Sequence, residues 1–131
     1  SVSLDGAFLL ARYALPSMVA RGGGALIGIS GVSHHIGFRD RAHVNAAKSG
    51  LEGLVRGLAK EFAEHRISVN AIAPGVVSHA GATYPSDLGI PMGRPAHEEE
   101  VAAMVRYLAD PRNNYVTGQT IHVNGGWFFG G

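Results

Sequence analysis

Apolar residues recur every three or four positions in three segments, which is the spacing of one face of a helix. The first segment, residues 5–20, contains Pro16 and is followed by the helix-stopping run Gly22-Gly23-Gly24. The second, residues 44–62, has the clearest pattern, and the third, residues 98–109, begins with three glutamates that favour the dipole of a helix start. We predict a helix over each segment. The charged side chains expected on the solvent face of the second helix are Glu52, Arg56, Lys60 and Glu64.

Three shorter apolar runs predict strands at residues 25–29, 67–73 and 119–123. The first two runs are almost continuously apolar, which is typical of strands that are buried on both faces of a parallel sheet. Residues 30–42 and 76–95 have no sustained period, so we predict loops there. The second loop is long enough to be a functional lid or a disordered excursion.

The predicted elements alternate between helix and strand along the whole chain. This order is that of βαβ units, which form a parallel sheet with right-handed crossovers. The loops that leave the carboxyl ends of such strands carry the ligand sites of open α/β sheets. The sequence therefore predicts an α/β fold whose chemistry lies in the loops after the strands.

Length and composition limit the classes of function. The 131 residues fit one small domain, and a net charge of +1 provides no basic surface for nucleic acid. The absence of cysteine excludes a disulfide framework and thiolate metal sites, and it suits a cytoplasmic protein. No segment has the length or composition of a membrane span or a secretion signal. We therefore expect a cytoplasmic protein with no nucleic-acid or membrane partner.

Five short motifs resemble, in order and at matching separations, landmarks of the short-chain dehydrogenases/reductases. They are Val2-Ser3-Leu4-Asp5-Gly6-Ala7-Phe8, Leu15-Pro16-Ser17-Met18, Val69-Asn70-Ala71-Ile72-Ala73-Pro74-Gly75, Tyr115-Val116-Thr117-Gly118-Gln119 and Val123-Asn124-Gly125-Gly126.

The resemblance implies a Rossmann-like doubly wound parallel sheet, of which residues 1–131 would form the C-terminal half, a single partial domain with the last three strands. It also implies NAD or NADP as cofactor, bound mainly by the N-terminal half. No Gly-rich phosphate-binding turn occurs in these residues, so binding of the cofactor by this part alone is not expected. Members of the family pair through the long helix and through the last helix and strand, which implies a homo-oligomer or a related partner subunit.

The resemblance also assigns roles to four positions, of which only one keeps its usual residue. Lys48, within Asn45-Ala46-Ala47-Lys48-Ser49-Gly50, matches the lysine that holds the nicotinamide ribose. The proton-transferring tyrosine, the serine that binds the substrate carbonyl and the asparagine of the water relay are replaced by Val44, Gly31 and Ser3. Valine has no proton to exchange, so the usual transfer cannot occur at this position.

A shift of the alignment by one residue would instead place Ser30 and His43 at the serine and tyrosine positions. His43 lies five residues before Lys48, which turns it away from that face of the helix. The resemblance further assigns cofactor contacts to Lys48, Pro74, Gly75 and Val77.

Other residues allow a structural and a functional interpretation. His79 replaces a threonine that usually lies near the cofactor, and His79 and Tyr84 are either a displaced acid or the surface of a lid. A polar cluster in the first loop is not expected to bind metal, because adjacent loop histidines seldom converge on an ion: His34, His35, Asp40 and His43. The final aromatic residues are interpreted as packing or subunit-contact groups: Trp127, Phe128 and Phe129.

Two hypotheses for function follow. In the first, the chain is an NAD(P)-dependent oxidoreductase-like protein for carbonyl or hydroxyl substrates, with activity that is lost or altered by the changes at Val44, Gly31 and Ser3. In the second, it is a non-catalytic subunit or a truncated product that supports an active partner through the oligomer interface.

Overall fold

The computed structural model describes residues 2–31, 42–85 and 87–130. Its helices are α1 (Val2–Arg21), α3 (Ala42–Phe62) and α4 (Glu98–Ala109), and its strands are β1 (Gly24–Ile29), β2 (Ile67–Pro74) and β3 (Thr120–Val123). Two short 3₁₀ turns, Ala63–His65 and Pro111–Asn113, follow α3 and α4. All six predicted elements are present, with boundaries shifted by a few residues at most.

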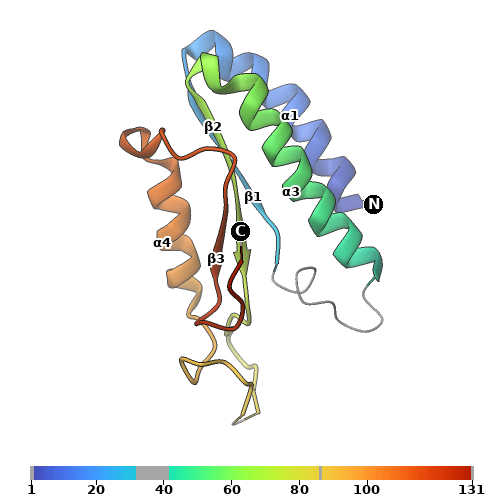
Figure 1. Cartoon of the computed structure of the whole chain (residues 1–131), viewed down its shortest axis with the longest axis vertical. Helices are drawn as coiled ribbons and strands as arrows, with labels where there is room; N and C mark the ends of the chain where they lie inside the picture. Colours follow the sequence, from blue (N-terminus) through green and yellow to red (C-terminus); the bar gives the residue numbers. More distant parts are fainter. Residues whose placement is uncertain (1, 32–41, 86, 131) are drawn as a thin grey trace.

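The three strands form one parallel sheet in the order β1-β2-β3. Gly24 pairs with Ile67 at one end of the β1–β2 register and Ile29 with Ile72 at the other. Helices α1 and α3 lie side by side on one face of the sheet, and α4 covers the other face (Figure 1). The α/β class and the parallel sheet predicted from the alternation of elements are therefore confirmed.

Helix α1 ends where the backbone adopts a left-handed conformation. Gly22 has a φ of 87°, and its N–H donates to the carbonyl of Val19 at 3.1 Å. The N–H of Gly23 donates to the carbonyl of Met18 at 3.0 Å. This pair of bonds is the Schellman motif, which satisfies the last carbonyls of a helix and favours glycine at its turn.

The core lies between β2 and the helices α1 and α3. Residues Ile67 to Ala73 of β2 are all buried. A cluster of buried residues there comprises Ala11, Leu15, Met18, Val55, Ala59, Ile67, Val69 and Ala71. Apolar side chains from both helices therefore cover one face of the central strand, which is the main source of stabilisation in such a domain.

The prediction that the first strand is buried on both faces is wrong. Every residue of β1 is at least partly exposed, and 44% of Ile29 is accessible. The reason is its place in the sheet, because β1 is hydrogen-bonded to β2 on one edge and has no strand on its other edge among the described residues. Ala42, which was expected in the loop, is the first residue of α3.

Two of the motifs found in the sequence contact each other along the far edge of β2. Asn70, which is fully buried, donates from Nδ2 to the carbonyl of Val116 at 2.9 Å and accepts the N–H of Gln119 at 3.0 Å. Thr117 Oγ1 accepts the N–H of Val69 at 3.0 Å. These side chains replace the ladder bonds that a longer β3 would make, and they dock the segment before β3 onto the sheet.

We predict that Asn70→Ala lowers the free energy of unfolding by about 1–3 kcal/mol, because the part-buried carbonyl of Val116 and N–H of Gln119 lose their partner. The measurement is urea unfolding followed by circular dichroism. Asn114→Ala is the matched control, since Asn114 makes a similar bond to the carbonyl of Arg66 at a site open to water. Equal losses in the two variants would contradict the special role of Asn70.

Candidate functional site

Lys48 lies in the second turn of α3, with its ammonium at the carboxyl end of β1. Its Nζ donates a hydrogen bond to the backbone carbonyl of Ile29 at 3.2 Å, and the side chain remains partly exposed. In the described part of the chain, Lys48 makes no other hydrogen bond or ion pair. The ammonium can therefore donate further hydrogen bonds at the carboxyl end of β1.

Val44 and Gly31, at the positions that the resemblance assigns to tyrosine and serine, carry no polar side chain. Val44 is four residues before Lys48 in α3, so the two side chains lie on one face of the helix. Gly31 follows β1, and a Cβ built on it would meet no atom within 4 Å. There is therefore open space for a larger side chain at the position where the resemblance expects serine.

Ser30 points into the interior of the protein. The residue is 5% exposed, its hydroxyl donates to Glu52 Oε2 at 2.7 Å, and its N–H donates to the carbonyl of Ile72 at 2.8 Å. His43 is exposed at the start of α3. The shifted alignment would therefore require the hydroxyl of Ser30 to leave a buried hydrogen bond, and the geometry favours the alignment that uses Gly31 and Val44.

Glu52 is a buried carboxylate, which corrects the prediction that it lies on the solvent face of its helix. It is 4% exposed and accepts from Ser30 and from Thr120 Oγ1, the latter at 3.1 Å. These bonds tie α3 to the end of β1 and to the start of β3. Helical periodicity could not identify this role, although Glu52 lies one turn after Lys48 on the same face of the helix.

Pro74 and Gly75 shape the chain as it leaves β2. Pro74 is the last residue of the strand, and the N–H of Gly75 donates to the carbonyl of Val123 at 2.9 Å. A Cβ on Gly75 would lie 2.9 Å from the Cβ of Asn124, so only glycine allows this approach. The structure therefore shows a packing reason for this motif.

Val77 presents its backbone polar groups to the side opposite Ala96. The two residues form an isolated parallel bridge, in which Ser78 donates to the carbonyl of Ala96 at 2.8 Å and Ala96 donates to that of Val76 at 2.9 Å. Because the residues flanking Val77 make these bonds, its own N–H and C=O point away from Ala96. The carbonyl of Val77 accepts the hydroxyl of Tyr84 at 2.9 Å.

His79 and Tyr84, which the sequence left as either an acid or a lid surface, form a hydrogen-bonded pair. Tyr84 Oη lies 3.3 Å from His79 Nδ1, and the rings meet edge to face with centroids 6.4 Å apart. His79 is exposed and Tyr84 is partly buried. The five-residue spacing of these two residues gave no indication of this contact.

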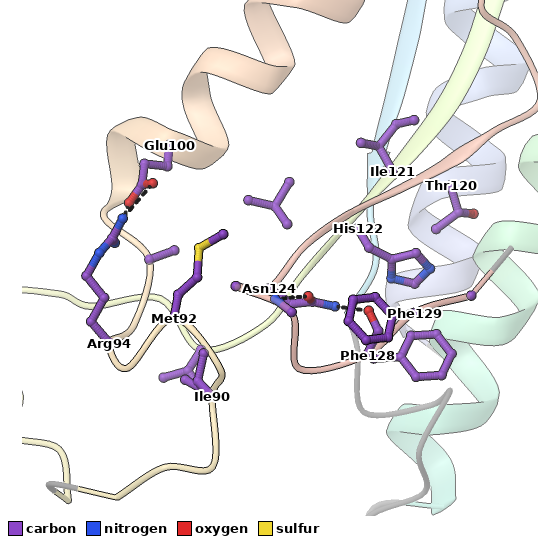
Figure 2. Close-up of a pocket in the computed structure, with 16 residues that line it drawn as sticks. Ile90, Met92, Arg94, Glu100, Thr120, Ile121, His122, Asn124, Phe128 and Phe129 are labelled. Carbon is purple, nitrogen blue, oxygen red and sulfur yellow. Dashed lines mark hydrogen bonds and ion pairs between the residues drawn. The ribbon is translucent and has the colours of Figure 1, made fainter.

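A cavity of about 600 Å³ lies between β3, the start of α4 and the C-terminal residues (Figure 2). Its walls include Met92, His122 and Phe128, and the last two rings are 5.2 Å apart. Lys48, Pro74, Gly75 and Val77 do not line it, although Val76, between the last two, does. Its lining is mainly apolar, with one ion pair at its rim.

That ion pair joins Arg94 and Glu100. The guanidinium donates to both carboxylate oxygens, at 2.7 and 3.1 Å (Figure 2). The N–H of His97 also donates to Oε1, at 2.9 Å. These bonds, that of Arg94 above all, lower the pKa of the Glu100 carboxyl to about 2. Both side chains remain open to solvent, so the pair orders the start of α4 more than it stabilises the fold.

Some predicted residues cannot be placed. His34, His35 and Asp40 lie outside the described residues, as does the side chain of Ser3. Among the residues that are described, no group of three histidine, cysteine or acidic side chains could hold a metal ion, and no helix is long and apolar enough to cross a membrane.

The C-terminal aromatic residues differ in their exposure. Trp127 and Phe128 are partly buried, whereas Phe129 is 85% exposed. The first two are therefore packing groups. Phe129 makes little contact within the chain, and whether it contacts another subunit stays a prediction.

We predict that Glu52→Ala lowers the free energy of unfolding by about 2–4 kcal/mol, because Ser30 and Thr120 lose a buried acceptor. Glu52→Gln should cost less, since its carbonyl oxygen still accepts from Thr120. Glu61→Ala, at an exposed position of the same helix, should change stability by less than about 0.5 kcal/mol. Chemical unfolding of the three variants tests this order, and equal losses for Glu52→Ala and Glu61→Ala would contradict it.

We predict that Arg94→Ala raises the pKa of Glu100 from about 2 toward the ordinary range of glutamate, because the main cause of the depression is removed. The bond to Arg94 is fully present above the ordinary pKa of glutamate and is lost as the pH falls through about 2. A ¹³C NMR titration of the carboxyl group measures the shift. Arg112→Ala, which breaks the separate Arg112–Asp110 pair, should leave the titration of Glu100 unchanged.

Residues 1–128 match the family model described as enoyl-(acyl carrier protein) reductase. The chain is 44% identical over 125 residues to 2,3-dihydroxy-2,3-dihydro-p-cumate dehydrogenase of Pseudomonas putida, covering 88% of this chain and 48% of that protein. It is 37% identical over 135 residues to acetoacetyl-CoA reductase of Allochromatium vinosum, covering 98% and 55%.

The structure is similar to that of acetoin dehydrogenase from Enterobacter cloacae, with a TM-score of 0.89, 37% identity and coverage of 96% of this chain and 52% of that chain. The chain thus spans about half the length of the relatives it matches. The matched region contains every element described above, including the sheet and the edge that carries Lys48. The chain belongs to the short-chain dehydrogenase/reductase family of oxidoreductases.

Proposed function

We propose that this chain is the C-terminal half of an NAD(P)-dependent oxidoreductase for carbonyl or hydroxyl substrates, in which the family's usual proton transfer does not operate. The observation that carries the proposal is the Lys48 ammonium at the carboxyl edge of the sheet, with Val44 one helical turn away. The relatives are named as dehydrogenases or as a reductase of compounds that carry hydroxyl or keto groups. This supports the substrate class.

The residues at this edge fit the nicotinamide end of such a cofactor. The Lys48 ammonium is anchored by the carbonyl of Ile29 and can donate further hydrogen bonds to ribose hydroxyls. The N–H of Val77 points to the side away from Ala96, where it can bind a carboxamide oxygen. When bound, NAD(P)H would supply the hydride. In this proposal Pro74 and Gly75 place Val77 and do not need to touch the cofactor themselves.

The proposed change in activity follows from the side chains that are absent. Val44 has no acidic proton, and Gly31 has no hydroxyl for the substrate oxygen. A general acid is worth about 10²–10⁴-fold in rate, and loss of the second donor removes further stabilisation from the developing oxyanion. The scaffold around both positions is intact, so the change affects the reaction and leaves the fold in place.

A second candidate function is that of a non-catalytic subunit, as a homo-oligomer or beside a related active chain. The observation in its favour is the apolar surface of α1, where Phe8, Leu10 and Tyr13 are 52%, 64% and 79% exposed. Large exposed apolar groups on one helix are typical of protein interfaces. The half-exposed strand β1 adds an edge that needs cover. Both roles are compatible with a cytoplasmic protein.

We predict that Val44→Tyr combined with Gly31→Ser raises NAD(P)H-dependent carbonyl reductase activity by about 10²-fold or more, because the pair restores the missing acid and hydroxyl. The double variant should fold normally, since a Cβ at position 31 meets no neighbour. The assay measures oxidation of NAD(P)H. It uses a longer protein in which an N-terminal half of the family's fold precedes this chain.

The matched control adds Lys48→Met to the double variant and should remove the gain. Absence of any gain in the double variant, with cofactor binding preserved, would show that the pocket no longer accepts a carbonyl substrate at this edge.

A further inference from the structure

The segment that follows β2 forms a turn, and it carries two side chains that can exchange a proton, His79 and Tyr84. The N–H of Ala82 donates to the carbonyl of His79 at 3.1 Å, which makes a turn and brings Tyr84 back toward Val77. Tyr84 Oη then contacts both the carbonyl of Val77, at 2.9 Å, and His79 Nδ1, at 3.3 Å. Three residues of the loop thus form one hydrogen-bonded unit.

The proton positions in this unit follow from the donors and acceptors. Tyr84 has a single hydroxyl proton, and the carbonyl of Val77 can only accept, so that proton is directed to Val77. The hydroxyl oxygen must then accept a proton from His79 Nδ1. In the neutral ring this leaves the lone pair on Nε2, and His79 is exposed. The contact with Tyr84 therefore selects one tautomer of a solvent-accessible imidazole.

The hydrogen-bonded unit follows the carboxyl end of β2, and Lys48 lies at the carboxyl end of the neighbouring strand β1. Ile29, whose carbonyl binds the Lys48 ammonium, pairs with Ile72, and β2 ends two residues later at Pro74. The excursion after β2 lies at the end of the sheet where α3 begins (Figure 1). His79 follows Val77 by two residues and is linked to its carbonyl through Tyr84.

We infer that His79 transfers the proton that Val44 cannot, and that Tyr84 is the residue that positions it. The inference rests on the proposed function, since it concerns the same carbonyl or hydroxyl substrate and the same edge. A nucleophile or base that is oriented by a second side chain is the common arrangement in acid–base catalysis. Here the phenol fixes the tautomer, and the imidazole contacts the substrate oxygen.

The chemical step balances with the nicotinamide as hydride donor. In the reducing direction the carbonyl carbon gains a hydride, the carbonyl π electrons move to oxygen, and that oxygen takes the proton from Nε2 of the His79 imidazolium. The carbonyl would thus be reduced to an alcohol, with NAD(P)H, when bound, as the two-electron reductant, and the neutral ring would regain its proton from water. In the oxidising direction Nε2 accepts the hydroxyl proton.

The first test measures the tautomer of His79 by ¹⁵N NMR of the histidine rings, in the 131-residue chain. We expect the neutral ring to be protonated at Nδ1, and Tyr84→Phe to release this preference, because phenylalanine cannot accept the Nδ1 proton. His65, at the opposite end of α3, is the internal control and should be unchanged. A neutral His79 protonated at Nε2 in the unmodified chain would overturn the inference.

The second test compares His79→Ala in two backgrounds of the protein that joins this chain to the N-terminal half of the fold. In the natural background we expect kcat to fall by about 10²-fold with little change in KM, and added imidazole to restore part of the rate. In the Val44→Tyr, Gly31→Ser background the same change should cost less than about threefold, because the phenol introduced there provides the usual acid. A merely structural role for His79 would not produce imidazole rescue or this dependence on background.

The outcomes separate this inference from the proposed function. Activity that appears only after Val44→Tyr and Gly31→Ser, or an equal loss on His79→Ala in both backgrounds, would leave the proposed function standing and overturn the role of His79. The absence of carbonyl reduction and alcohol oxidation in both backgrounds would refute the proposed function and, with it, this inference.

Discussion

The parallel pairing of β2 with both of its neighbours is the constraint on which the rest of the structure depends. Seven of its eight residues are buried, with β1 bonded to one edge and β3 to the other. Because parallel strands end at the same edge of a sheet, this pairing brings the start of α3, the end of β1 and the excursion after β2 together. The buried strand β2 therefore helps to place Lys48, although Lys48 itself belongs to α3.

Packing and chemistry place different demands on the residues of this chain. Asn70 is fully buried and bonds two backbone groups, and Gly75 lies too close to Asn124 for any side chain, so a change at either position would disturb the fold. Gly31 faces open space, and Val44 lies in a helix that does not need a phenol to form. The scaffold can therefore persist when the side chains at these two positions change, which is what the proposed function requires.

Periodicity predicted the elements well and the environment of single residues poorly. The helices and strands follow from local spacing, and even the end of α1 follows from Gly22, whose left-handed conformation other residues adopt at a cost. Periodicity could not show that Glu52 is buried, because its partners Ser30 and Thr120 are 22 and 68 residues away in sequence. It also assigned β1 to the interior, since an apolar run does not reveal whether its strand lies at the edge of a sheet.

The sequence by itself determined the family and the order of the elements, because these are properties of residue identity and spacing; that Val44 and Gly31 stand at the family's tyrosine and serine positions stays a prediction from the same source. Only the tertiary structure decided that Ser30 is held in the interior, that Lys48 is anchored to Ile29, and that Tyr84 bonds both Val77 and His79. The physical reason is that hydrogen bonds depend on position to within a few tenths of an ångström. Such positions are set by the packing of the strands and helices together, which no local pattern of residues records.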